Sequence, residues 1–166
     1  MSDLPKAQSV ERAGEWSGDA DQIRLDYDAR FVRRKRLETD AGRAFVVDLP
    51  QTLSLDHSDA LVLSDGTRVR VCAAAEDLFA VTGDNLAQLA WHIGNRHTPC
   101  EIAQGRLLIQ RDKVIGHMLE HLGATLVPVV EPFTPEGGAY GHGRTHAHEH
   151  GATAHTPPHG GHSHAH

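Results

Sequence analysis

The sequence predicts an α+β protein of two domains followed by a histidine-rich tail. From residue 22 to about residue 75, short β-rich runs alternate with turn residues. After that, strand-like runs alternate with two stretches of helical periodicity, and beyond about residue 140 no large apolar residue occurs. The predicted units are a small all-β domain over residues 1–75, an α+β domain over 76–140 and a tail over 141–166.

The first domain is predicted to be all β. Residues 1 to about 20 are polar without a sustained period, so we expect a frayed start. Turn sequences that include an Asp-Gly hairpin signal then separate four runs. The predicted strands are IRLDY, AFVVDL, ALVL and RVRVCA, and the predicted turns are TDAG, LPQT and SDGT. The basic run RFVRRKR is interpreted as the solvated face of a strand or a docking surface for an acidic partner.

The second domain begins with a predicted strand, DLFAV, and a helix in DNLAQLAWHIGN. We expect Asp84 to cap this helix and Gly94-Asn95 to end it. Trp91 lies off the apolar side. The apolar side follows the i, i+3, i+4, i+7 spacing and consists of Leu86, Leu89, Ala90 and Ile93.

The remainder of this domain continues with two short strands, CEIAQ and RLLIQ, hinged at Gly105. A second helix is predicted from about Asp112 to Leu122, ended by Gly123, before a last strand, TLVPVVE. Its predicted apolar side consists of Val114, Ile115, Met118 and Leu122. The order βαββαβ predicts a ferredoxin-like domain with both helices on one face of an antiparallel sheet.

The composition argues against several classes of function. The tail holds one of the 16 basic and one of the 22 acidic residues, so the body carries the whole net charge of −6. This balance speaks against nucleic-acid and membrane-surface binding. No apolar run approaches the ~20 residues that span a bilayer, and the start lacks the apolar core of a signal peptide. Because two cysteines fit a reducing compartment, we expect a cytoplasmic protein.

The tail predicts metal binding. Nine of the 14 histidines fall in it, and the pattern H-x-H-x-H occurs twice, as HAHEH and HSHAH. Neutral imidazole suits Ni, Zn and Cu(II) better than Mg or Ca. With almost nothing to bury, the tail is expected to be disordered without metal. The predicted ligands are His142, His146, His148, His150, His155, His159, His162, His164 and His166.

Three patterns in the body are further candidates for metal binding. HMLEH, His117 to His121, fits the H-x-x-E-H signature of zinc peptidases, but its helix ends about one residue later and no third ligand is apparent. We interpret it as accidental, with a weak metal-binding pair as the alternative. Cys100 could pair with His97, although a small buried apolar side chain is the favoured interpretation. His97 alone makes a poor site, but a two-fold axis near it would bring two copies together.

The stretches GNRHTP, VIGHMLEHLG and PFTPEGGAYGHGRTHAHEH resemble the UreE family of urease accessory nickel chaperones. The likeness runs from about residue 22 through the tail and includes RRKR and SDGTRVRV. The resemblance implies that the β-domain docks partner proteins and that the ferredoxin-like domain dimerises, with His97 of each subunit at a shared metal site. One departure is Arg111 to Lys113, where some relatives carry an H-x-H pair, because neither Arg nor Lys offers a lone pair to a metal.

The function that the resemblance implies is that of a carrier and not an enzyme. A homodimer would deliver Ni(II) during assembly of the urease active site, working with the urease apoprotein and with accessory proteins that include the maturation GTPase. Zn(II) and Cu(II) are expected to compete for the same imidazoles. The alternative is a general divalent-metal buffer or storage protein without a delivery role.

Overall fold

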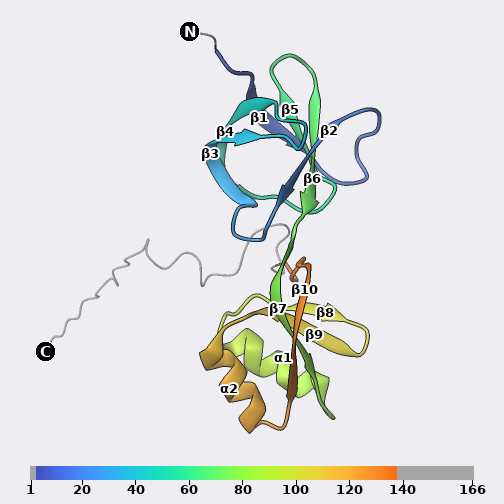
Figure 1. The fold of residues 1–166 in the computed structure, drawn as a ribbon, viewed down its shortest axis with the longest axis vertical. Helices are drawn as coiled ribbons and strands as arrows, with labels where there is room; N and C mark the ends of the chain where they lie inside the picture. The colour runs from blue at the N-terminus through green and yellow to red at the C-terminus, as the bar shows by residue number, and fades with distance from the viewer. Residues whose placement is uncertain (1–2, 138–166) are drawn as a thin grey trace, which may run out of the picture.

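The structure is a computed structural model that describes residues 3–137. Its chain forms two domains that join where strand β6 leads almost directly into β7 (Figure 1). The tail and its predicted disorder lie outside the described residues. Within them, no helix is long and apolar enough to cross a membrane.

The first domain is a six-stranded sheet in the order β2-β6-β5-β1-β4-β3. Its strands are β1 Lys6–Glu11, β2 Asp21–Leu25, β3 Phe31–Glu38, β4 Ala44–Ser54, β5 Ala60–Leu63 and β6 Arg68–Ala73. The sheet encloses one apolar core, in which Phe45, Val47, Leu49, Leu61, Val69 and Val71 are almost inaccessible to solvent. Period-2 alternation along β4 and β6 places five of these side chains inside, and Leu61 is contributed by β5.

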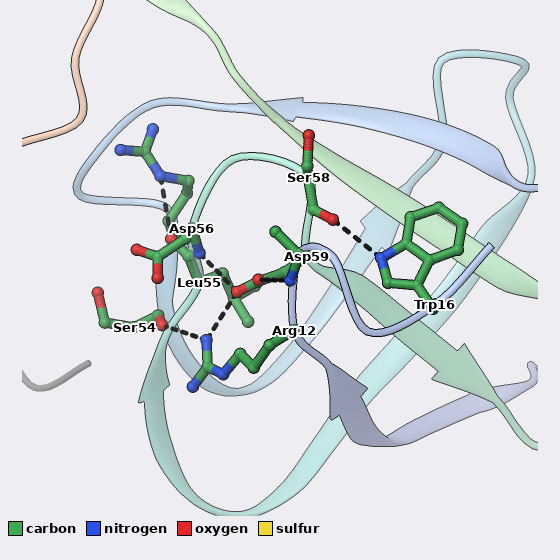
Figure 2. Close-up of polar contacts among 9 residues, drawn as sticks. Arg12, Trp16, Ser54, Leu55, Asp56, Ser58 and Asp59 are labelled. Carbon is green, nitrogen blue, oxygen red and sulfur yellow. Dashed lines mark hydrogen bonds and ion pairs between the residues drawn. The ribbon is translucent and has the colours of Figure 1, made fainter. Parts of the chain in front are cut away.

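The prediction of a frayed start was wrong. Lys6–Glu11 forms β1, an inner strand between β5 and β4. The segment after it is tied down by Arg12, which pairs with the buried Asp59 at 2.6 Å, and by the Trp16 indole, which donates to the Ser58 carbonyl (Figure 2). Little of β1 is buried, so its sequence shows no alternation of apolar and polar residues. The strand forms because β5 and β4 supply hydrogen-bond partners for its backbone.

The predicted turn at LPQT was also wrong, because β4 continues through it to Ser54. The pairing of β4 with β3 shifts register between Val32 and Arg34. Pro50 lies on β4 opposite this irregularity, where no ladder hydrogen bond is required of it. A strand can therefore carry a proline there without ending.

The second domain is a four-stranded antiparallel sheet with two helices. Its elements are β7 Ala75–Thr82, α1 Leu86–Asn95, β8 Glu101–Ala103, β9 Arg106–Gln110, α2 Lys113–His121 and β10 Thr125–Pro132. The strand order is β10-β7-β9-β8, the split arrangement of ferredoxin-like domains. Leu89 and Ile93 of α1 and Ile115 and Leu119 of α2 pack on one sheet face, and Figure 1 shows both helices on that side.

Two details of the helices differ from the predictions. The N-cap of α1 is Asn85 and not Asp84, because the Asn85 side chain accepts from the Gln88 amide at 3.1 Å. Of the predicted apolar side of α2, Ile115 is buried, but Val114 and Leu122 are exposed, and Leu119, which was not predicted, faces the sheet. The buried side is thus rotated around the helix toward Gly116, where an added Cβ would lie 3.0 Å from Leu126.

Candidate metal centre after helix α1

The chain turns sharply at the end of α1. The His97 amide donates to the Gly94 carbonyl at 2.9 Å, and the Thr98 amide donates to the Ile93 carbonyl at 3.3 Å. This pair of hydrogen bonds is the Schellman motif, whose left-handed position usually holds glycine. Here that position is His97, with φ of +55°. These backbone bonds hold the turn, so its conformation does not depend on the imidazole, which is exposed.

A histidine in this conformation is uncommon. A Cβ in the left-handed region costs roughly 1–2 kcal/mol relative to the right-handed one. Residues held in such conformations concentrate at functional sites. The strain therefore adds a physical reason to examine His97, beyond its place in the GNRHTP motif.

Cys100 follows three residues later and lies directly before β8. Its side chain is half-buried and packs against the core on the helix side of the sheet. Burial, and to a lesser extent the nearby Glu136 and Glu101 carboxylates, raise the pKa of the thiol to about 11. At neutral pH the thiol is protonated, so Cys100 behaves as an apolar side chain and is a weak metal ligand.

The segment that leads into the tail returns to this corner. We call residues 133–137 the strap. Its Glu136 amide donates to the Cys100 carbonyl at 2.8 Å, and its Thr134 amide donates to the Glu101 carboxylate at 2.9 Å. Since Cys100 is three residues from His97, the two Cα atoms lie within ~11 Å of each other. The folded chain thus brings the strap, the last described segment before the tail, to the vicinity of His97.

The strap was not predicted from the sequence. The signal available was Phe133, an apolar residue between two prolines, in PFTP, which favours an extended, anchored segment over a free linker. The nine predicted tail ligands, His142 through His166, lie outside the described residues. The structure therefore places the strap that precedes the tail and none of these histidines.

The H-x-x-E-H pattern lies on the exposed face of α2. The rings of His117 and His121 are 4.8 Å apart, nearly perpendicular, and α2 ends at His121. His117 and Glu120 border a cavity of about 260 Å³ between α2 and β10. Among residues 3–137, no three His, Cys, Asp or Glu side chains are grouped so as to hold a metal ion. Within this part of the chain, the pattern lacks the third ligand of a zinc peptidase.

Where some relatives of the resembled family carry H-x-H, this chain uses its side chains structurally. Arg111 donates to the Leu78 and Val129 carbonyls at 3.0 Å each. Asp112 caps α2 by accepting from the Val114 and Ile115 amides. These residues tie α2 to the sheet.

The fold defines the class of protein: a β-domain joined to a ferredoxin-like domain that carries an exposed histidine at a left-handed corner. Two family models match the chain, the N-terminal domain of the UreE urease accessory protein over residues 4–74 and its C-terminal domain over residues 76–166. The chain belongs to the UreE family of urease accessory proteins.

Relatives named urease accessory protein UreE are similar over nearly their whole length. The protein of Ruegeria pomeroyi is 61% identical over 148 residues, which cover 89% of this chain and 99% of that protein. The protein of Cereibacter sphaeroides is 58% identical over 91% of this chain and 83% of its own. The protein of Rhodobacter capsulatus is 52% identical over 91% and 96%.

Proposed function

We propose that this protein is a nickel carrier in urease maturation. The tail histidines collect Ni(II), a site built on His97 holds it, and the ion is passed on during assembly of the urease active site. Membership of the UreE family supports the link to urease. The observation that supports the route is the strap, because its Glu136 amide is bonded to the Cys100 carbonyl, three residues from His97.

The chain lengths fit transfer from the tail to the corner. His142 follows Glu136 by six residues, so its Cα lies within ~22 Å of that anchored point. A tether of this kind keeps an imidazole at an effective concentration of the order of millimolar around the corner. Ni(II) would then move by exchange of one imidazole for another, and no bond of a substrate is made or broken.

His97 suits a transient holder better than a permanent one. A single exposed imidazole leaves most coordination positions open, and open positions allow exchange. We propose that the homodimer brings two His97 side chains to one site. Trp91 and Ile102, which are 63% and 56% exposed, are the apolar residues near this corner that such a contact would cover. Zn(II) and Cu(II) would compete for the same nitrogen ligands.

The β-domain would meet the protein partners in the cytoplasm, namely the urease apoprotein and accessory proteins that include the maturation GTPase. Strand β3 lies at the edge of its sheet and exposes its basic run. Arg34 is already paired with Asp48 at 2.9 Å, and Arg36 with Glu38 at 3.6 Å. Lys35 lies between them in sequence and is also exposed, on the opposite side of the strand. An acidic partner surface would fit this edge through its charge.

The test compares Ni(II) and Zn(II) titrations of the full chain with those of a chain ending at Tyr140. Truncation should lower the number of ions bound while leaving one tight site per dimer, and replacing His97 should remove that site. His117→Ala, on the exposed face of α2, is the control. The decisive measurement is urease activation at limiting nickel. Normal activation by a His97 variant would contradict delivery through this site and would favour a metal buffer.

A further inference from the structure

The first residue of the strap is held between the two domains. The Phe133 ring is fully buried and meets the Tyr27 ring edge-on, with centroids 5.5 Å apart. Tyr27 belongs to the β-domain, where it follows β2. The other members of this cluster, Leu78, Ala80 and Leu108, lie on the sheet face opposite the helices. Phe133 therefore fills the junction between the β-domain and the ferredoxin-like sheet.

Arg30 of the β-domain holds the backbone of the same residue. Its guanidinium is 2% exposed and donates to the Leu25 carbonyl at 2.9 Å, to the Leu55 carbonyl at 3.2 Å and to the Phe133 carbonyl. Burial lowers the pKa of Arg30, and the nearby Glu76 carboxylate opposes this. A buried cation is tolerated only where hydrogen bonds replace water. The Phe133 carbonyl is thus one of the three hydrogen-bond acceptors that allow Arg30 to be buried.

Beyond Phe133, the strap is hydrogen-bonded to the segment that follows His97. One residue after Phe133, the Thr134 amide is bonded to the Glu101 carboxylate. Two residues further on, the Glu136 amide is bonded to the Cys100 carbonyl. The β-domain, the strap and the segment after His97 are therefore joined in series by hydrogen bonds.

We propose that Arg30 is a positioning residue for metal transfer: by holding the Phe133 carbonyl, it fixes the strap, which precedes the tail, against Cys100. The effect of Arg30 on metal transfer rests on the proposed function, whereas its effect on the position of the strap does not. Without this bond, the strap separates from Cys100 more often, and the tail histidines must search a larger volume to reach His97. The β-domain then contributes to metal transfer in addition to any docking.

The experiment measures amide hydrogen exchange in the full-length chain. Arg30→Met removes the donors while keeping much of the side chain's bulk, and Arg34→Met, at an exposed position of β3, is the matched control. The Glu136 amide should exchange about tenfold faster or more in Arg30→Met, because a bond to a charged donor no longer opposes opening. The rate should be unchanged in Arg34→Met. Equal protection of Glu136 in Arg30→Met and the wild type would overturn the proposal.

A second variant covers the case in which Arg30→Met does not fold. Arg30→Lys keeps the buried charge, but one ammonium cannot reach three separate carbonyls as a guanidinium does. Faster exchange at Glu136 with intact β-domain amides supports the role of Arg30, and wild-type protection rejects it.

Metal loading separates this proposal from the proposed function. With one equivalent of Ni(II) per chain, loss of the His97 ring signal in NMR spectra reports arrival at the corner, and arrival should be slower in Arg30→Met or Arg30→Lys. Unchanged arrival despite a loosened strap would reject the positioning role. If wild-type His97 shows no response to Ni(II), the proposed function fails, while the exchange data still decide whether Arg30 holds the strap.

Discussion

Replacing His97 with glycine should abolish the metal site and also stabilise the protein. The two bonds that form the turn use the His97 and Thr98 amides, so the turn survives loss of the imidazole. At φ of +55° the histidine is strained. Glycine removes this strain of roughly 1–2 kcal/mol, less its greater freedom in the unfolded chain, for a net gain of about 0.5–1 kcal/mol.

Calorimetry of the metal-free protein measures this gain. For a chain of 166 residues, it corresponds to a rise in Tm of about 1–4 °C. His97→Ala keeps the strain and should stay within about 0.5 kcal/mol of the wild type. His117→Gly, the same substitution inside α2, should instead lose about 0.3–0.5 kcal/mol. Both His97 variants should lose tight Ni(II) binding. A His97→Gly variant that melts no higher than His97→Ala would refute the strain argument.

The remaining predictions concern a thiol, a turn and a packing contact. Because the pKa of Cys100 is raised to about 11, its alkylation at pH 8 should be much slower than in the denatured chain, as peptide mapping would show; equal rates would contradict its burial. The Thr67 hydroxyl and amide, and then Arg43, lower the pKa of Asp65 from 3.8 to about 2. Asp65 therefore stabilises the fold above pH 3.8, and this contribution is lost as the pH falls through about 2. Thr67→Val should raise the pH midpoint of the Asp65 titration followed by NMR. An unchanged midpoint would exclude the Thr67 hydroxyl as the cause of the lowered pKa. Gly116→Val should cost about 1–3 kcal/mol in urea unfolding, because its Cβ would meet Leu126 at 3.0 Å; wild-type stability would mean that Leu126 moves aside.

Local patterns were enough to predict most elements of the fold. The i, i+3, i+4, i+7 spacing in α1, the end of α2 before Gly123 and the hairpin at Gly105 all depend on residues a few positions apart. The same is true of the motif that pointed to the family, GNRHTP, because it is a contiguous stretch. Such features can be predicted from sequence because the interacting groups are near neighbours in the chain.

The tertiary structure decided what depends on distant partners. Strand β1 has little apolar pattern of its own and is held by β4 and β5. Arg30 is separated from Phe133 by 103 residues, and Glu136 bonds to Cys100 from the far end of the domain. The sequence alone determined that this chain carries a histidine at a helix end and nine more in a tail. Only the fold decided that the strap, which precedes the tail, is bonded three residues from that histidine, because long-range hydrogen bonds leave no local pattern.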